Sequence, residues 1–455
     1  MQLNLLLEKT RSFIDSLLFP LLIGLLATLI WFVPGNYSWI PSIIYSALSF
    51  LPLVATDGKA YMPLMLFTTI ICSERVSFTT IPTYLYVIAA SIFVSEVIFI
   101  ILKKPKLVRG DIMIPFAILF GVFFVSYIYN SIQEGHASSY GVLFILALFL
   151  LLLLYVVFST VLGRGESLSY FCKTYVCLAF FISIEILIYQ ARHEFGFINA
   201  NFDLGWSYTP PTSSTLLCLS LPFFGILIFK KQFFYIIPEI FVIYTIIILS
   251  TDSGLLCLIL GIIPLILLSF KTYGKYYPYI SLACIVTIAT AFAILLAVND
   301  RFNNRVLLAV QSLNLIEPSS PMRADLFNKT VEQFLSNPVI GTSISSLLTA
   351  DGTVLLSSNT VLSVMAMGGS LGLAAFLYLE IKIYFCCLKK QTSDKYLFLV
   401  FLLLFELIGL IDNTMFNLII LLLFLTANSC YQMSNRPDEV LVHDGYYQYL
   451  REQKY

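Results

Sequence analysis

The stretch YGVLFILALFLLLLLYVVFSTV (140–161) contains no charged side chain. An apolar run of about 20 residues crosses the hydrocarbon core of a bilayer as one helix, because lipid offers the backbone N–H and C=O groups no partner except one another. The whole chain shares this character: 59% of its 455 residues are hydrophobic and 11% are charged, against about 25% charged in soluble domains. The composition predicts an all-α, polytopic integral membrane protein with a single membrane domain over residues 1–455.

Similar runs along the chain predict about 12–14 transmembrane helices. The third run is short for a full crossing. The runs are 13–33, 38–54, 60–72, 83–102, 112–130, 140–161, 169–190, 212–229, 233–250, 253–270, 277–298, 357–386, 395–410 and 413–430.

Basic residues between the spans predict the orientation, because Lys and Arg are enriched in loops that stay in the cytoplasm. If the spans alternate, both termini and the tail 431–455 lie on the side that carries most of the Lys residues, which we assign to the cytoplasm. Five basic segments share that side: KKPKLVRG (103–110), GRGES (163–167), KKQ (230–232), KTYGK (271–275) and KKQTSDK (389–395).

Few cations fall on the opposite, external side, and nearly all of them are Arg. The planar guanidinium donates two parallel hydrogen bonds to a carboxylate or a phosphate, which Lys does not do. These side chains either pair with nearby carboxylates such as Asp300, Glu194 or Asp325, or bind an anionic ligand. We favour the ligand for Arg192 and Arg323. The six external cations are Arg75, Arg192, Arg301, Arg305, Arg323 and Lys329.

Two short external segments add candidate residues. The first, 190–214, places Arg192, His193 and Glu194 just past the end of a span, followed by the aromatic residues Trp206 and Tyr208. The aromatic rings either stack on a ligand or anchor the segment at the membrane interface. The second, LSTDSGLL (249–256), predicts a tight turn with Asp252 near membrane depth, where the carboxylate either caps the next helix or has a functional role.

The longest external loop covers residues 299–356. Pro321 follows two serines and is a helix start signal, apolar residues then recur at helical spacing, and Asn337-Pro338 ends the pattern. We expect an amphipathic helix that lies along the outer surface or folds over the bundle. Arg323 falls in its first turn, where free N–H groups and a positive partial charge already suit an anion.

The order of these segments resembles the O-antigen polymerase and ligase superfamily of membrane glycosyltransferases. Members carry an Arg-bearing external segment, an LGWG-like stretch, an SRG-like turn, a long loop reading R-x-x-L/W and F-x-x-N-P-x-x-G, a His-Asn or similar pair, and a Gly-rich helix. This chain is similar over about residues 190–380. The matching stretches are Arg192, FDLGWSY (202–208), STDSG (250–254), RADLFNKTVEQFLSNPVIG (323–341), Ser358-Asn359 and MGGSLGLAAF (367–376).

The resemblance implies an enzyme that acts on glycan carried by undecaprenyl diphosphate. Arg192 and Arg323, helped by Lys329 and Arg305, would bind the diphosphate and stabilise it as it leaves. The general base would be His193, Glu194, Asp252 or Asp351, among which the sequence does not choose. Glycan or lipid contacts would come from Trp206, Tyr208 and Asn359. The resemblance implies that neither a metal nor another cofactor is needed, which fits the lack of an Asp-x-Asp motif.

Two departures from the family pattern matter. Gly254 stands where the family often has Arg after the turn serine, so that Arg is not carried over. Ser358 stands where ligases have His, which favours a polymerase of repeat units for O-antigen, capsule or exopolysaccharide over a ligase. A flippase or transporter of the same lipid-linked glycan is a further alternative, but it should carry charges within its spans.

The same resemblance predicts where the protein works and with which partners. We expect a multi-pass protein of a bacterial inner (plasma) membrane with both termini cytoplasmic. Its partners would be the lipid-linked glycan and the bilayer, together with a flippase and a chain-length regulator. No nucleic acid is expected.

Overall fold

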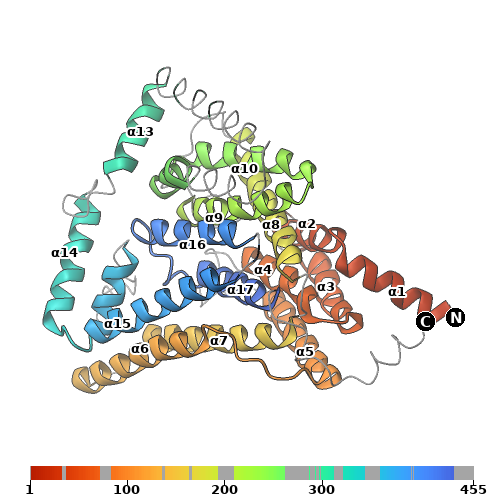
Figure 1. Cartoon of the computed structure of the whole chain (residues 1–455), viewed down its shortest axis with the longest axis horizontal. Helices are drawn as coiled ribbons and strands as arrows, with labels where there is room; N and C mark the ends of the chain where they lie inside the picture. The colour runs from red at the N-terminus through yellow and green to blue at the C-terminus, as the bar shows by residue number, and fades with distance from the viewer. Residues whose placement is uncertain are drawn as a thin grey trace.

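A computed structural model describes residues 2–32, 37–71, 83–135, 139–162, 167–192, 210–261, 299–311, 321–343, 359–390, 392 and 394–434, with the single positions 286, 290, 293 and 297. Every regular element within these residues is helical, which confirms the all-α prediction (Figure 1). In chain order the elements are α1 (Gln2–Asp15), α2 (Leu18–Phe32), α3 (Trp39–Leu48), η1 (Leu51–Val54), η2 (Gly58–Ala60), α4 (Tyr61–Ile71), α5 (Thr83–Lys103), α6 (Met113–Glu134), α7 (Ser139–Val161), α8 (Ser167–Arg192), α9 (Pro210–Phe229), η3 (Phe233–Tyr235), α10 (Ile236–Leu249), α13 (Asp300–Gln311), α14 (Pro321–Ser336), α15 (Thr360–Lys389), α16 (Lys395–Gly409) and α17 (Leu418–Ser434). A short helix, Asp252–Gly261, follows α10.

Six described helices are long and apolar enough to cross a membrane by themselves: α5, α6, α7, α8, α9 and α15. A bent pair formed by α1 and α2 brings the number to seven if the pair counts as one span. Several other predicted spans coincide with helices of 10 to 17 residues, among them Asp252–Gly261 and α17. The protein is therefore a multi-pass membrane protein that contains both full-length and shorter helices.

A bend divides the chain within the predicted span 13–33. The chain forms α1 and α2, which meet at an angle of 68°. Pro20 has no N–H to donate to the carbonyl of Ser16, which interrupts the helical hydrogen-bond pattern at this point. The Ser16 hydroxyl donates to the carbonyl of Phe13 (2.7 Å) and accepts from the N–H of Leu18 (3.2 Å), which ends one helix and starts the next.

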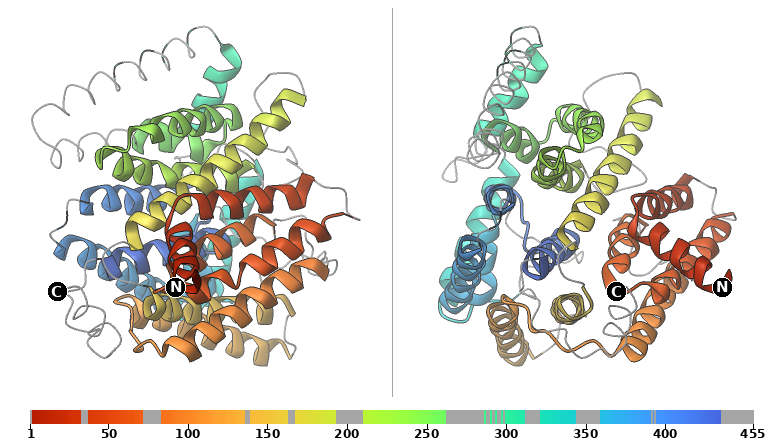
Figure 2. Two further views of the ribbon diagram at one scale, coloured as in Figure 1. Left: turned by 90° about the vertical axis from the view of Figure 1, so that its right-hand side faces the viewer. Right: turned by 45° about the vertical axis from the view of Figure 1, so that its right-hand side comes forward.

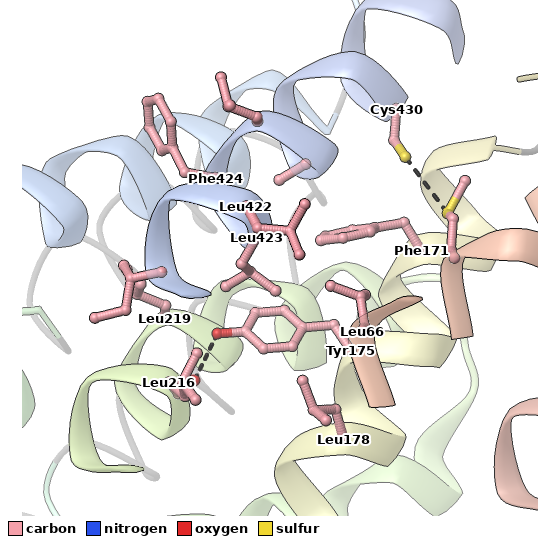
Figure 3. Packing of buried hydrophobic residues seen from close by; sticks show 14 of the residues in the cluster. Leu66, Phe171, Tyr175, Leu178, Leu216, Leu219, Leu422, Leu423, Phe424 and Cys430 are labelled. Carbon is pink, nitrogen blue, oxygen red and sulfur yellow. Dashed lines mark hydrogen bonds between the residues drawn. The ribbon is translucent and has the colours of Figure 1, made fainter. Parts of the chain in front are cut away.

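The core of the bundle lies around α9, which is buried along most of its length and packs against α8, α10 and α16. Figure 3 shows the contact with α8, where the Tyr175 hydroxyl donates to the carbonyl of Leu216 (2.6 Å). The ring of Phe223 lies edge-on to those of Phe171 and Tyr175, with centroids 5.2 and 5.4 Å away. This packing fixes the position of the first turn of α9, which carries part of the site described below.

Several predicted basic segments meet at one end of the bundle. Lys230, after α9, forms an ion pair with Asp394 (2.9 Å), before α16. The Lys390 ammonium, after α15, donates to two carbonyls near the end of α17, Tyr431 (3.2 Å) and Gln432 (3.0 Å). The Gln432 side chain in turn accepts from the N–H of Asp111, in the connection from α5 to α6 (2.9 Å). These elements therefore share one end, as strict alternation of the spans requires.

Helix α15 is broken at Gly369, whose φ of 62° and ψ of −155° are not helical. The segment Pro338–Thr342, which follows α14, fits into this break. The N–H groups of Ser370 and Leu371 donate to the carbonyls of Pro338 (2.8 Å) and Val339 (3.3 Å), and the N–H of Thr342 donates to the carbonyl of Ala366 (2.8 Å). The two chain segments thus satisfy the backbone groups that the break would otherwise leave without partners.

Two glycines allow this close approach. A Cβ atom at Gly369 would lie 2.3 Å from the carbonyl oxygen of Val339, and one at Gly341 would lie 2.5 Å from the backbone of Met367. Helix α6 closes the junction from the other side: the Ser126 hydroxyl donates to the Met367 carbonyl (2.7 Å), and the Asn130 amide donates to the Gly341 carbonyl (3.0 Å). We call this arrangement the loop–helix junction.

The amphipathic helix predicted after Pro321 is confirmed as α14, and it packs against α15. In the right-hand view of Figure 2 several bundle helices are seen end-on, whereas α13 and α14 run lengthwise. The two helices therefore lie across the direction of the bundle, on the side away from α1 to α3. This is the orientation of a helix at a membrane surface.

Replacing Gly369 by Ala should destabilise the fold. Its backbone conformation is open essentially only to glycine, and a side chain costs about 1–3 kcal/mol there even without the clash with Val339. Gly121 in α6 is the matched control, because a Cβ atom at this position meets nothing within 4 Å. Thermal unfolding of the purified protein in detergent should show a lower melting temperature for G369A, and an equal or slightly higher one for G121A because Ala favours a helix interior more than Gly. Equal melting temperatures for G369A and the wild type would contradict the role of the junction.

Candidate functional site

Uncharged polar side chains gather at the end of the bundle opposite the basic segments. Four stretches meet there: the first turn of α9, the turn after α10, the start of α15 and the turn between α16 and α17. We call the group the hydroxyl–amide cluster. It consists of Thr212, Ser214, Ser253, Thr360, Ser363, Asn413, Thr414 and Asn417.

Hydrogen bonds join the start of α15 to the turn before α17. The Thr360 hydroxyl accepts from the N–H of Thr414 (3.1 Å) and lies 3.3 Å from the Thr414 hydroxyl. The Asn413 amide donates to the Ser363 hydroxyl (2.9 Å). Such side-chain pairs stabilise contacts between membrane helices by about 0.6 kcal/mol each on average. They hold the two turns together without any charged group.

The first turn of α9 joins the same cluster. The Asn417 amide donates to the Thr212 hydroxyl (3.2 Å). Ser214 is fully buried and Ser253 is 1% exposed, and neither hydroxyl has a hydrogen-bond partner among the residues that the structure describes. Most buried hydroxyl groups in proteins form a hydrogen bond. Two that do not, in one small region, indicate that packing alone does not explain the polar character of this region.

Gly254 explains one departure from the family pattern. A Cβ atom at this position would lie 2.0 Å from the Ser214 hydroxyl oxygen and 2.8 Å from that of Thr251. No larger side chain fits here without moving α9. The Arg that the family often has after the turn serine therefore has no room at this position.

Asp252 is the first residue of the helix Asp252–Gly261, at the turn predicted from the sequence. The capping position belongs to its neighbour: the Thr251 hydroxyl accepts from the N–H of Gly254 (3.2 Å), and the Thr251 carbonyl accepts from the N–H of Leu255 (3.0 Å). Asp252 is partly exposed. The expectation that it caps the helix is therefore corrected in favour of Thr251, and its role as a general base stays a prediction.

Asn359 precedes α15 and is 5% exposed. Its side-chain oxygen accepts from the N–H of Leu362 (3.0 Å), and its amide donates to the carbonyl of Leu410 (3.1 Å). Asn359 thus caps α15 and ties it to the end of α16. The predicted glycan contact of Asn359 would compete with these two bonds.

The predicted site cations lie on three helices, α8, α13 and α14. Arg192 ends α8, Arg305 lies in α13 and Arg323 opens α14, and for these three residues the structure describes the helix and not the side chain. Lys329 is half-exposed and pairs with Asp325 one turn earlier in α14 (2.8 Å). Its charge is therefore partly balanced within its own helix.

Helix α13 is placed beside the cluster. Val306 packs with Leu255, Leu256 and Ile411, which belong to the helix Asp252–Gly261 and to the turn after α16. Because Arg305 precedes Val306 in the chain, the α13 backbone carries it to the same end of the bundle as Asp252 and Asn413.

Other predicted site residues lie outside the described part of the chain. These are His193, Glu194, Trp206, Tyr208 and Asp351. No group of three or more His, Cys, Asp or Glu side chains with the spacing of a metal site occurs among the residues whose positions are described.

The residues of the hydroxyl–amide cluster were not predicted from the sequence. Their signal was present in the polar stretch DNTMFN (412–417) between two apolar runs and in PPTSST (210–215) at the start of another. Each stretch alone is typical of a turn or of a helix start, and only the fold brings them together.

Comparison with known proteins does not assign the chain to a family: a scan against models of protein families finds no match, and neither does a search of curated proteins. The motif resemblance and the arrangement of the described residues therefore carry the functional argument.

Replacing Gly254 by Ala should destabilise the protein by about 1–3 kcal/mol, because the added methyl group overpacks the contact with Ser214. S214A alone should change the melting temperature little, since its hydroxyl has no partner among the described residues. The double variant S214A/G254A should recover part of the loss, because it removes the nearest of the clashing atoms. A double variant no more stable than G254A would show that this contact is not the limiting one.

Proposed function

We propose that the protein is a membrane glycosyltransferase that polymerises oligosaccharide repeat units carried on undecaprenyl diphosphate. The product would be a surface polysaccharide such as O-antigen, capsule or exopolysaccharide, and the reaction would occur on the external face of a bacterial inner membrane.

One observation supports the proposal most strongly. Helix α14, which begins two residues before Arg323, is fixed to the broken helix α15 through the loop–helix junction, and this junction is built from the N-P-x-x-G stretch and the Gly-rich helix. These are two of the segments on which the resemblance rests, and they are in direct contact. Arg323 is thus attached to a fixed part of the bundle.

The proposed reaction transfers a glycan from one lipid carrier to another. A hydroxyl oxygen of the acceptor sugar attacks the anomeric carbon of the donor, the bond from that carbon to the diphosphate breaks, and a base takes the hydroxyl proton. Negative charge grows on the departing diphosphate, and Arg323 and Arg192 stabilise it, with Arg305 and Lys329 adding positive charge nearby. Asp252 is the candidate base whose position is described, at the end of the bundle that carries the hydroxyl–amide cluster.

A second candidate function, transport of the lipid-linked glycan, gains support from carboxyl groups inside the bundle. Glu96 in α5, Glu185 in α8 and Glu380 in α15 are all buried in helices long enough to span the membrane. Ionisable residues at such positions often serve ion or substrate pathways. The three residues also fall within the predicted spans 83–102, 169–190 and 357–386, where a transporter should carry ionisable groups.

The two candidates differ in the glycan that accumulates when the gene is deleted. A polymerase leaves single repeat units on undecaprenyl diphosphate at the external face, and long chains disappear. A transporter leaves repeat units at the cytoplasmic face. Mass spectrometry of lipid-linked glycans, combined with a membrane-impermeant label for their accessibility, separates these results. Full-length chains on the carrier would instead indicate a ligase, and an unchanged lipid-linked pool would refute all three.

In the deletion strain, complementation with R323A should leave polymer synthesis reduced by about 10- to 100-fold, the range expected when a charge-assisted hydrogen bond of about 1.5–3 kcal/mol is lost in the transition state. The matched control is E332Q, a change of charge at an exposed position of the same helix. Polymer length and amount can be read from gels of the extracted glycan. Equal synthesis by R323A and E332Q at equal protein levels would contradict the role of Arg323.

A further inference from the structure

Two acidic side chains that the proposed reaction does not use meet inside the bundle. Glu380 of α15 and Glu406 of α16 are hydrogen-bonded to each other. Glu380 is 9% exposed, and one of its carboxyl oxygens has no hydrogen-bond partner in the described part of the chain. Both residues lie in apolar helices, and that of Glu380 is long enough to cross the membrane.

No cation balances this pair within the described part of the chain. The acidic group that interacts with the Glu380 carboxyl is that of Glu406, and the one that interacts with Glu406 is that of Glu380. The other ionisable group close to both is the phenol of Tyr384, one turn after Glu380 in α15. The remaining helices packed on this pair, α6 and α14 against α15 and α9 against α16, add no ion pair to either carboxyl group.

Two carboxylates in contact cannot both carry their charge, and a hydrogen bond between two carboxyl groups requires a proton on one of them. Burial in apolar surroundings strengthens this requirement, because an unpaired charge in the membrane is costly. The contact between the two carboxyl groups therefore requires that the pair binds one proton.

We propose that Glu380 and Glu406 form an intramembrane proton-binding site that holds one proton between α15 and α16. This site is independent of the proposed glycosyltransferase activity. Loss of the proton leaves two negative charges in contact, and their repulsion acts on the packing of α15 against α16. Because α15 also carries the loop–helix junction, the site links protonation to the helix that holds α14.

N,N′-dicyclohexylcarbodiimide tests the proposal, because it modifies protonated carboxyl groups in apolar surroundings. The purified full-length protein in liposomes is treated over a range of pH, and peptide mass spectrometry measures the adduct at each Glu. Glu380 should be labelled in the wild type, with labelling that falls as the pair loses its proton. In E406Q the pH of half-maximal labelling at Glu380 should drop by at least about one unit, since the like charge that retains the proton is gone.

The reciprocal variant E380Q should shift the labelling of Glu406 in the same direction. E96Q is the matched control, because Glu96 is a buried membrane carboxyl on α5, away from the pair, and its removal should leave the profile of Glu380 unchanged. The labelling of Glu96 in the E406Q and E380Q variants serves as a check that the bundle is folded. An unshifted profile of Glu380 in E406Q, or the absence of label at both residues while Glu96 is labelled, would overturn the proposal.

Discussion

The fit of the segment Pro338–Thr342 into the break in α15 is the constraint on which the rest of the arrangement depends. A helix interrupted inside a membrane protein exposes N–H and C=O groups that lipid cannot satisfy. Here a loop from outside the bundle supplies the missing partners, and it can do so only because Gly341 and Gly369 carry no side chain. Broken helices at membrane depth occur where they are buried by protein or line a cavity, and they often adjoin functional sites.

The two ends of the bundle are built from different chemistry. One end uses charges, such as the ion pair of Lys230 with Asp394 and the contacts of Lys390. The other end uses hydroxyl and amide groups, with the described cations carried on α13 and α14 around it. An uncharged polar region beside helix α13, which carries Arg305, is suited to an anionic headgroup attached to a sugar. The glycosyltransferase proposal follows from this division together with the motif resemblance.

Local features of the fold could be predicted from the sequence. The start of α14 at Pro321 and its end before Asn337 follow from helix signals within a few residues, and the apolar runs are evident from composition. The features that required the fold are long-range. Thr360 pairs with Thr414, Gly341 contacts the backbone of Met367, and Glu380 meets Glu406, each through segments that are ordinary when considered alone. The bend after α1 was missed because hydropathy does not record the N–H that Pro20 lacks.

The most direct test of the central claim is reconstitution. Lipid-linked repeat units accumulated by the deletion strain are supplied to the purified protein in liposomes, with a metal chelator present and no nucleotide sugar. We expect the single units to be converted into longer glycans on undecaprenyl diphosphate, and the R323A protein to convert them far more slowly. Repeat units that stay single, or that only change sides of the membrane, would contradict the assignment of this protein as a polymerase.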